Sequence, residues 1–258
     1  MVELPLAVDG LSSQAAAGIL RSLGTGQFCD FEFICGELRI PVHRAVVCSQ
    51  SPVFAAACLG RKPQAANSNS LQIPDTDPQT VRLMVQYLYT GKHAFSLQVL
   101  GSLHDTSIAT CETRVIDDPG YTRMKNAYVT VLTAHIKLVA LAETYHIHQL
   151  VEQVVGEFRA LISRPECGYC FVAIIEVIPR VYELENASGN ILRRECIAAI
   201  VASFGPWLTA HGYHRKALDN VLAAVPQFQK ELLEGFIVGK YQIGQKEDSV
   251  PESESRDQ

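Results

Sequence analysis

The 258-residue sequence lacks the features that mark nucleic-acid and nucleotide binding. Its formal net charge is -5 at pH 7, and no run of basic residues with interleaved aromatics occurs. A surface that binds DNA or RNA usually shows a basic stripe, so direct nucleic-acid contact is not expected. The seventeen glycines are dispersed and form neither G-x-x-x-x-G-K nor G-x-G-x-x-G, which argues against a phosphate-binding loop.

Long hydrophobic runs and a targeting signal are missing as well. The first eighteen residues carry two acids and no basic region, unlike a secretory signal peptide. The longest apolar runs, such as residues 196–208, are shorter than a bilayer span. The eight cysteines are scattered through apolar segments, which favours reduced thiols over a disulfide framework. We therefore expect an intracellular protein, nuclear or cytoplasmic, that does not enter a membrane.

What is present is a mixed strand and helix pattern followed by helices only. Residues 28–42 alternate between apolar and polar positions around Gly36-Glu37, which predicts a β-hairpin before a short helix at 43–50. Ser51-Pro52 and Asp77-Pro78 each place a helix cap before a proline. The helix that starts at Pro52 is apolar nearly all round, so it is expected to be central and buried. Further elements are predicted as a strand at 71–73 and helices at 78–90, 128–143, 147–161, 167–185, 190–204, 214–225 and 226–238.

Breaker residues and composition set the remaining boundaries. Residues 94–126 mix polarities and contain Asp-Asp-Pro-Gly, a turn signal, so they are predicted to be an insertion. Pro179 is expected to interrupt one helix, and Gly205-Pro206 to end another. Residues 245–258 are charged and have no apolar anchors, so a disordered acidic tail is predicted there.

His43 and Cys48 are the first residues to consider for catalysis. A thiolate activated by an imidazole is a common nucleophilic device. On a helix, however, positions i and i+5 are separated by about 140° around the axis. No Asn or Asp lies nearby in the sequence to orient the ring. We therefore interpret Cys48 as a packing thiol and His43 as a hydrogen-bonding residue at a strand-to-helix corner, and we do not expect an enzyme.

A second cluster, Cys167-Gly-Tyr-Cys170 with His211-Gly-Tyr-His214, has the spacing of metal ligands. Two thiolates and two imidazoles suit tetrahedral zinc. The separation of about forty residues is long for a compact finger, and the H-x-x-H spacer is shorter than the usual three to five residues. Both pairs also fall at predicted helix starts. Helix packing is the preferred interpretation and zinc the alternative; no other cofactor is expected.

Separated segments of the chain resemble the BTB/POZ family, and their sequence is most similar to its fungal form. They read TGQFCDFEFICGELRIPVHRAVVCSQSPVFAAAC, then LQIPDTDPQTVRLMVQYLYTG, then VLTAHIKLVALAETYHIHQLVEQVV. The last contains a "Leu-Ala-x-x-Tyr-x-Ile-x-x-Leu" junction, matched here by Leu141, Ala142, Tyr145, Ile147 and Leu150. Farther on, residues 181–183 and 191–193 resemble a "Val-Tyr … Leu-Arg" helix pair in the helical extension of such proteins.

The resemblance implies an α+β fold, in which helices cluster around a short three-stranded sheet, followed by an all-α C-terminal region. The implied organisation is an N-terminal segment with a dimerisation helix at 1–26, a BTB/POZ domain at 27–162, a helical region at 163–244 and the tail at 245–258. The implied function is non-catalytic protein–protein binding, as a scaffold or adaptor that associates with itself or recruits a partner.

Site residues implied by the resemblance lie in the first half of the chain. Asp30 and Arg44 match a charged pair at or near the dimer groove of many BTB domains, and His43 lies beside them. Because a charged pair in a partly buried groove costs desolvation energy, it fixes geometry more than it adds stability. Residues 12–23 match the dimerisation helix, but their small, alanine-rich face leaves monomer and homodimer both open.

Binding to a cullin is the alternative that the resemblance raises. BTB adaptors of cullin-type ubiquitin ligases often carry a hydrophobic-x-Glu motif, which neither RKPQAA nor KHAFSLQVL offers. This departure argues against the cullin role without removing it. A zinc-stabilised helical binding protein is the second alternative.

Overall fold

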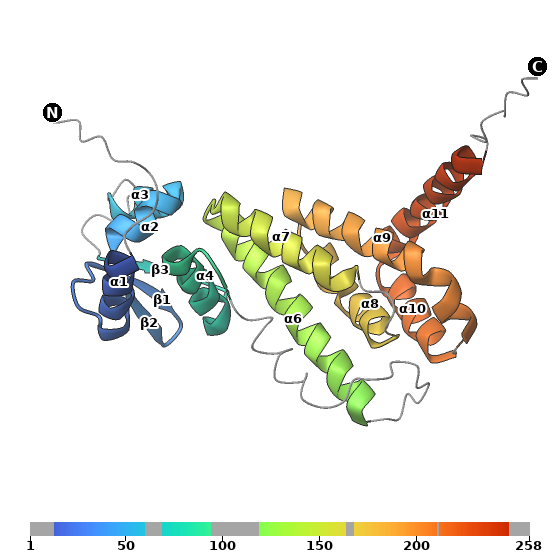
Figure 1. Cartoon of the computed structure of the whole chain (residues 1–258), viewed down its shortest axis with the longest axis horizontal. Helices are drawn as coiled ribbons and strands as arrows, with labels where there is room; N and C mark the ends of the chain where they lie inside the picture. Colours follow the sequence, from blue (N-terminus) through green and yellow to red (C-terminus); the bar gives the residue numbers. More distant parts are fainter. Residues whose placement is uncertain (1–12, 60–68, 94–118, 164–167, 211, 248–258) are drawn as a thin grey trace, which may run out of the picture. The chain divides into compact units, whose positions relative to one another are not determined.

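The computed structural model describes residues 13–59, 69–93, 119–163, 168–210 and 212–247 (Figure 1). Contacts group the chain into two compact units. Unit 1 comprises Met1–Ala94 with Leu141–Leu150, and unit 2 comprises Phe95–Ala140 with Val151–Gln258. Each unit is described by itself below.

Unit 1 contains a small sheet with helices gathered around it (Figure 1). Its elements are α1 (Ser13–Thr25), β1 (Phe31–Cys35), β2 (Leu38–Val42), α2 (Arg44–Gln50), α3 (Pro52–Cys58), β3 (Ser70–Gln72) and α4 (Pro78–Thr90). The strand order is β2-β1-β3, with β2 antiparallel and β3 parallel to β1. The predicted hairpin is confirmed: Phe33 lies opposite Ile40, and Gly36 turns the chain with a φ of 58°, which glycine adopts without a Cβ penalty.

The two predicted helix starts of unit 1 are confirmed by their caps. The Ser51 hydroxyl accepts a hydrogen bond from the Phe54 N–H at 3.1 Å, and the Asp77 carboxylate accepts one from the Thr80 N–H at 3.1 Å. Each satisfies a backbone donor that the first helical turn would otherwise leave without a partner. Gly91, with a φ of 66°, ends α4 in the left-handed conformation typical of helix C-termini.

The core of unit 1 is built around a row of three aromatic rings. Phe54 lies between Phe33 and Tyr145, with ring centroids 4.7 Å apart in both pairs. The prediction that α3 is a central, buried helix holds for one face only, because only Phe54 and Ala57 are buried. The small alanines on its other faces expose little apolar area, so leaving them partly in solvent costs little free energy.

Unit 2 is helical. Its elements are most of α6 (Pro119–Thr144), most of α7 (His148–Ile162), α8 (Gly168–Tyr182), α9 (Ala187–Ala210), α10 (Gly212–Ala224) and α11 (Pro226–Glu247). Helix α8 packs against α9 and α10, and α11 packs against α9 and α10 as well. The largest fully buried side chains in this unit are Leu132, Leu138, Phe158, Phe171, Ile175, Ile178 and Phe228. The α+β fold with a helical C-terminal region is thus observed as predicted.

Three predicted boundaries in unit 2 are wrong, and each involves a proline. Helix α6 begins at Pro119, so the part of the predicted insertion from 119 to 126 is helical. Pro119 occupies the first helical position, where a proline is well tolerated. Helix α8 continues through Pro179, and α9 continues through Gly205-Pro206. A proline in a helix costs about 3 kcal/mol, and the buried residues around Pro179 in α8 offset that cost. Residues 94–118 and 248–258 of the predicted insertion and tail lie outside the described residues.

Helix α6 contains a long apolar stretch. Over residues 120–144 it is long and apolar enough to span a membrane by length and composition, unlike the apolar runs considered from the sequence. The core helix of a soluble protein can have the same character, and 44% of the most apolar stretch of α6 is buried inside the protein. Val131, Leu132, Ile136 and Val139 are among its buried residues. Core packing thus accounts for these buried positions of α6.

The helix pair that the sequence resemblance singled out is joined by Arg193. Its guanidinium donates hydrogen bonds to the carbonyls of Tyr182 and Leu184, at 3.1 and 2.7 Å, at the C-terminal end of α8. The same group lies 4.7 Å from the centroid of the Tyr182 ring. The Tyr182 hydroxyl in turn donates to the Glu231 carboxylate of α11 at 2.6 Å. Arg193 thus satisfies terminal carbonyls of α8 from the neighbouring helix α9.

Candidate functional site

Asp30 and Arg44, predicted as a charged pair, are in contact through the backbone of Arg44. The Asp30 carboxylate accepts a hydrogen bond from the Arg44 N–H at 2.8 Å. Arg44 is the first residue of α2, and the side chain of His43, at the N-cap position, forms no capping hydrogen bond. Asp30 therefore caps α2 from the start of the hairpin, where a carboxylate also interacts favourably with the positive end of the helix dipole.

The guanidinium of Arg44 binds three other groups. It donates to the Asp30 carbonyl at 3.2 Å, to the Cys58 carbonyl at 3.2 Å and to Asn69 Oδ1 at 2.8 Å. It also lies 5.2 Å from the centroid of the Phe31 ring. Arg44 thereby ties the start of β1 to the C-terminal end of α3 and to the segment before β3. The two residues hold this surface in a fixed geometry.

His43 lies at the strand-to-helix corner, where the sequence predicts it to form hydrogen bonds. Its backbone N–H donates to the Tyr89 hydroxyl at 2.8 Å, and its Nδ1 lies 2.7 Å from the same oxygen. The Tyr89 hydroxyl can donate a hydrogen bond to Nδ1 while it accepts one from the backbone N–H, and in that tautomer the ring proton is on Nε2. The Nε2–H can then donate to Ser22 Oγ at 3.1 Å, since Ser22 donates to the Ile19 carbonyl. One connected network thus joins α1, the corner and α4.

The cysteine near His43 is Cys29 and not Cys48. Cys29 Sγ lies 3.7 Å from His43 Nε2. Burial, and then the negative charge of Asp30, raise the pKa of the Cys29 thiol. Burial and the neighbouring Cys48 thiol raise the pKa of Cys58 to about 12. Because a nucleophilic cysteine needs a stabilised thiolate, these surroundings oppose cysteine chemistry at Cys29 and Cys58.

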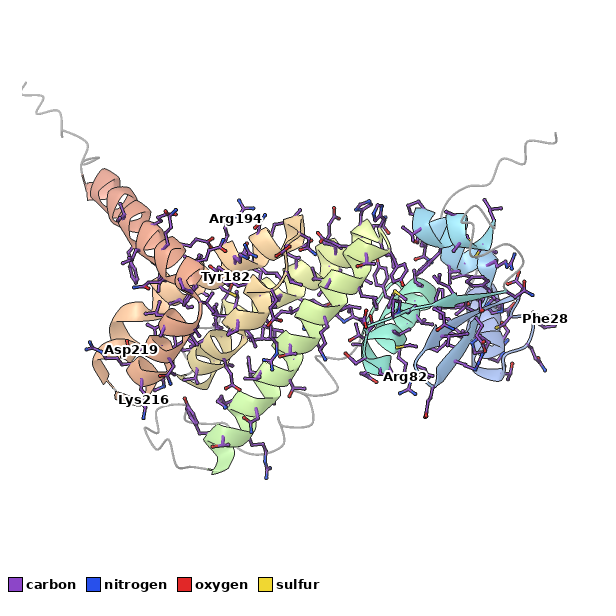
Figure 2. The ribbon with its side chains drawn as sticks, turned by 180° about the vertical axis from the view of Figure 1, so that it is seen from behind. Phe28, Arg82, Tyr182, Arg194, Lys216 and Asp219 are labelled. Carbon is purple, nitrogen blue, oxygen red and sulfur yellow. The ribbon has the colours of Figure 1, made fainter. Side chains whose placement is uncertain are left out.

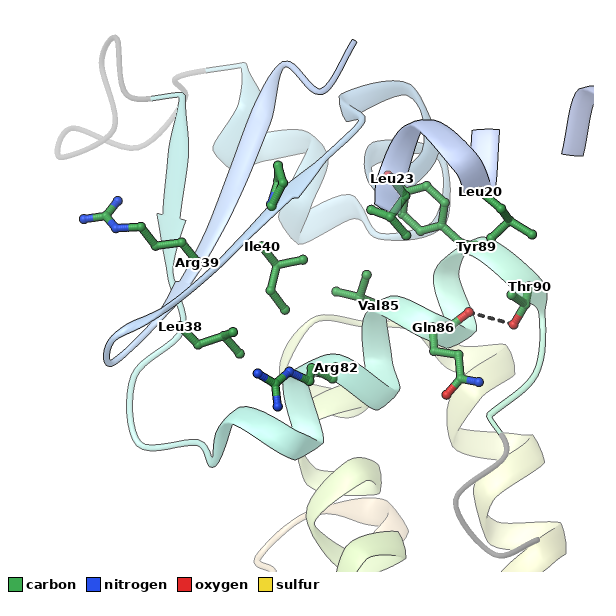
Figure 3. A pocket seen from close by; sticks show the side chains of 11 residues that line it. Leu20, Leu23, Leu38, Arg39, Ile40, Arg82, Val85, Gln86, Tyr89 and Thr90 are labelled. Atoms are coloured by element: carbon green, nitrogen blue, oxygen red, sulfur yellow. Dashed lines mark hydrogen bonds between the residues drawn. The ribbon is translucent and has the colours of Figure 1, made fainter. Parts of the chain in front are cut away.

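An open apolar groove lies between α1, β2 and α4 (Figure 3). Its volume is about 420 Å³. It is lined by Leu20, Leu23, Leu38, Arg39, Ile40, Pro41, Arg82, Val85, Gln86, Tyr89 and Thr90. This volume falls within the range of small-ligand pockets, but the groove is open and its length follows the edge strand β2. That shape suits a polypeptide segment better than a compact ligand.

Phe28, between α1 and β1, is the most exposed large apolar side chain among the described residues. It is 87% exposed and projects from unit 1 (Figure 2). Its φ of 61° lies in the left-handed region, which costs a non-glycine residue about 1–2 kcal/mol. The exposed ring loses the free energy that burial of its apolar surface would give, and the backbone conformation costs further free energy. Backbone strain of this kind is concentrated at functional sites.

The predicted zinc ligands fall only partly within the described residues. Cys167 and His211 lie outside them. Cys170 and His214 are 1% and 2% exposed, near the N-termini of α8 and α10, which pack against each other. His214 Nε2 lies 3.3 Å from the Tyr121 hydroxyl. The zinc site stays a prediction, to be tested by elemental analysis: about one zinc per chain, lost in Cys170→Ser and kept in Cys196→Ser, would establish it.

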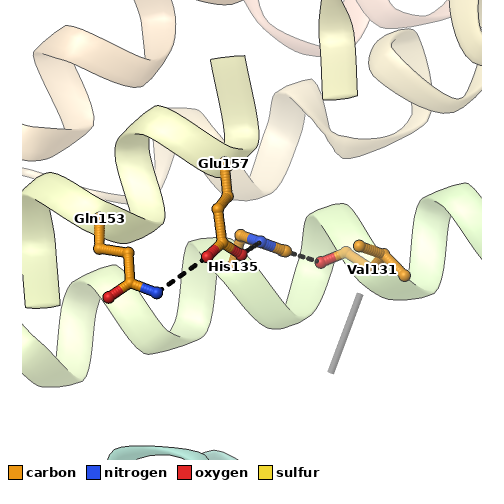
Figure 4. A network of polar contacts seen from close by, with 4 residues as sticks. All are labelled: Val131, His135, Gln153 and Glu157. Atoms are coloured by element: carbon orange, nitrogen blue, oxygen red, sulfur yellow. Dashed lines mark hydrogen bonds and ion pairs between the residues drawn. The ribbon is translucent and has the colours of Figure 1, made fainter. Parts of the chain in front are cut away.

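His135 forms a polar contact inside unit 2 that the sequence analysis missed (Figure 4). Its Nδ1 donates to the Val131 carbonyl at 2.7 Å, and its Nε2 lies 3.4 Å from the Glu157 carboxylate. Gln153 donates to the other oxygen of Glu157 at 3.0 Å. Because the partners lie on α6 and α7, no local sequence spacing could have indicated this contact. The arrangement tethers the two helices.

Comparisons with known proteins agree with the resemblance. Residues 20–109 match the family model described as the BTB/POZ domain. The chain is 37% identical to Kelch-like protein 3 of Danio rerio over 73 residues, and 34% identical to Kelch-like protein 4 of Homo sapiens over 91 residues. These matches cover 28% and 35% of this chain but only 12% of each relative, so the chain spans a small part of their length. The solved BTB domain of zebrafish PATZ1 aligns with 61% of this chain and 99% of its own, at 16% identity and a TM-score of 0.39.

Proposed function

The chain carries a BTB/POZ domain at residues 20–109, and we propose that it uses this domain to associate with a second copy and to recruit a protein partner. BTB/POZ domains are protein–protein interaction modules, and as a family they are generally non-catalytic. The proposed role is therefore that of a scaffold or adaptor. Self-association is the part that unit 1 supports most directly.

Two exposed apolar side chains of unit 1 carry the proposal. Phe28 is 87% exposed, and Leu20 on the preceding helix α1 is 39% exposed. Rigid aromatic side chains are typical anchors of protein interfaces, because they bury a large area at a low cost in conformational entropy. A C2 interface uses the same patch on both copies, so one exposed Phe28 in each copy suits a homodimer.

The surrounding contacts hold this patch in place before binding. The His43 network fixes α1 to the corner through Ser22. Asp30, two residues after Phe28, and Arg44 fix the start of β1. A pre-organised surface pays less conformational entropy on association. The predicted pair Asp30 and Arg44 would then support binding by positioning the Phe28 loop, without contacting the partner.

Replacing Phe28 with glycine separates binding from folding. Glycine adopts a φ of 61° freely, so Phe28→Gly should fold at least as stably as the wild type while it loses the anchor. We expect light scattering to show a dimer for the wild type and a shift toward monomer for the variant. The matched control is Ile237→Gln, which removes a side chain that is 58% exposed on α11. An unchanged oligomeric state and unchanged partner capture in Phe28→Gly would contradict the proposal.

A role as the adaptor of a cullin-type ubiquitin ligase is the alternative. Similarity to proteins named Kelch-like supports it, and the missing hydrophobic-x-Glu motif weighs against it. Co-elution of the purified chain with a purified cullin would decide between the two. Under our proposal the chain elutes without the cullin.

A further inference from the structure

The groove between α1, β2 and α4 has an apolar lining and a cationic end (Figure 3). The apolar lining comes chiefly from Leu20, Leu23, Leu38, Ile40 and Val85. Arg39 and Arg82 are the charged residues among its described lining residues, and both are exposed. Figure 3 shows them toward the Leu38 end of the groove, away from Leu20. An occupant with apolar side chains along its length and carboxylates at one end matches this distribution.

The two guanidinium groups are accessible to a partner. Arg39 contacts Glu32 at 2.8 Å, but its side chain is still 64% exposed. In the parts of the chain that the structure describes, the Arg82 side chain has no hydrogen bond or ion pair. The described lining residues include no carboxylate, although the chain as a whole has a net charge of -5. The groove is thus a local cationic region on an acidic protein, which favours an acidic partner.

The wall of the groove that β2 forms is poorly suited to pair with a further strand. The Glu32 N–H donates to the Asn69 carbonyl at 2.9 Å, so Glu32 turns its backbone groups toward β3. Its partner in β2, Pro41, therefore turns its own backbone away from β1, as does Arg39 two residues earlier. Proline has no N–H, so the outward donor in this part of β2 is that of Arg39. A proline on an edge strand opposes the addition of another strand.

The wall that α4 forms has the length of about two helical turns. Arg82, Val85, Gln86 and Tyr89 line it at three- and four-residue spacings, which places them on one face of α4. From Arg82 to Tyr89 this face extends about 10 Å, at 1.5 Å per residue. An extended chain covers that distance with about three residues. A helix covers it with apolar anchors at i, i+3 or i+4 and i+7, so the groove suits an amphipathic helix better than a strand.

We propose that this groove recruits an amphipathic helix of a different protein, with the apolar face of that helix in the groove and carboxylates of its last turn on Arg39 and Arg82. The proposal rests on the adaptor role proposed above, and it names the site and the class of partner. The last turn is also the negative end of the helix dipole, so the two cations stabilise it further.

Peptide selection on the full-length chain provides the probe. The library consists of displayed alanine-based helical peptides of about three turns with one randomised face. We expect the recovered peptides to carry apolar residues at i, i+3 or i+4 and i+7, together with Asp or Glu in the last turn. Recovery of no peptide, or of peptides without acidic residues, would overturn the proposal.

Charge reversal then tests the site. The most frequent peptide, synthesised with a fluorescent label, should bind the double variant Arg39→Glu, Arg82→Glu at least about tenfold more weakly than the wild type in anisotropy titrations. Replacing the carboxylates of the peptide with lysine should reverse this preference. Thermal unfolding checks that the double variant is folded, as expected when exposed side chains are changed.

Arg21→Glu is the matched control for this charge reversal. Arg21 is exposed on α1 and is not among the residues that line the groove. This change should alter the affinity for the peptide by less than about twofold, because a distant surface charge is screened by salt. Equal affinity of the peptide for the wild type and the double variant, or an equal loss in Arg21→Glu, would also rule out the proposed site.

Light scattering distinguishes a different protein from a second copy as the occupant. The double variant should keep the oligomeric state of the wild type, since the proposed partner is a different protein. A shift of the double variant toward monomer would assign the groove to a second copy and overturn the proposal. Phe28→Gly tests self-association without changing a residue that lines the groove, so failure of either proposal can be recognised independently of the other.

Discussion

The Asp30 carboxylate accepts the backbone N–H of Arg44 at 2.8 Å and thereby caps a helix that its own N-cap residue leaves uncapped. From its charges alone, this pair would be expected to act in binding, at or near the dimer groove. Here the guanidinium of Arg44 is engaged with two backbone carbonyls and Asn69. The pair therefore acts first on the stability of unit 1. It would affect binding through the position of the backbone that it holds.

The first prediction concerns this cap. Asp30→Ala removes the acceptor and should lower the free energy of unfolding by about 0.5–2 kcal/mol, measured by urea denaturation. Asp30→Asn keeps a side-chain oxygen that can accept the same N–H, so it should retain most of the stability. Equal losses in the two variants would show that the charge, and not the cap, is what matters.

The second prediction concerns Tyr89. Tyr89→Phe removes both the acceptor of the His43 N–H and the hydrogen-bond partner of His43 Nδ1. A fully buried polar group left without a partner costs about 1–3 kcal/mol. Because these groups are part-buried, we expect a loss of about 1 kcal/mol and a lower melting temperature. Ser22→Ala, which removes only the α1 end of the network, should cost less. A larger loss in Ser22→Ala than in Tyr89→Phe would contradict this order of importance.

The third prediction follows from the pKa of Tyr89, which burial raises to about 12. In the unfolded chain a tyrosine pKa is about 10. A raised folded-state pKa stabilises the fold fully below the unfolded pKa, and this contribution is lost as pH rises through the folded pKa. The free energy of unfolding should therefore fall between about pH 10 and pH 12. The fall should be shallower in Tyr89→Phe, and parallel curves for the two proteins would refute this assignment.

The fourth prediction concerns Gly189 in the first turn of α9. A Cβ at this position would lie 2.5 Å from the Leu184 carbonyl oxygen, a backbone atom that cannot move aside cheaply. Gly189→Ala should therefore cost about 1–3 kcal/mol through overpacking. Gly156→Ala in α7 is the control, because a methyl group there would meet nothing within 4 Å. That change should be neutral or stabilise unit 2 by up to about 1 kcal/mol, as measured by thermal unfolding.

Sequence reasoning succeeded where a few neighbouring residues determine the structure. Ser51, Asp77 and Gly36 act on the backbone within a few positions of themselves, so the helix starts and the hairpin turn could be predicted. It failed at Pro179, where the burial of surrounding side chains outweighs the local cost of a proline. Packing of this kind depends on residues that are distant in the chain.

The candidate site shows the same division. The resemblance predicted that Asp30 and Arg44 form a charged pair, but it did not predict that the Asp30 carboxylate binds the Arg44 backbone N–H. The contact between Cys29 and His43 was not predicted, because Cys48 is nearer to His43 in the sequence than Cys29 is. The left-handed conformation of Phe28 could not be predicted either. Such a conformation is usually marked by a glycine or an asparagine at the position itself, and here the residue is a phenylalanine.

Tyr145 indicates how long a fragment must be to contain the core of unit 1. Its ring stacks on Phe54, and its carbonyl accepts the Ser51 hydroxyl, although it lies more than fifty positions beyond the end of α4. A fragment that stops at residue 109, where the family match ends, would leave one side of Phe54 uncovered. Crystallisation and binding studies of unit 1 therefore require the chain to extend at least through residue 150, and the residues between 94 and 141 are best kept or replaced by a linker.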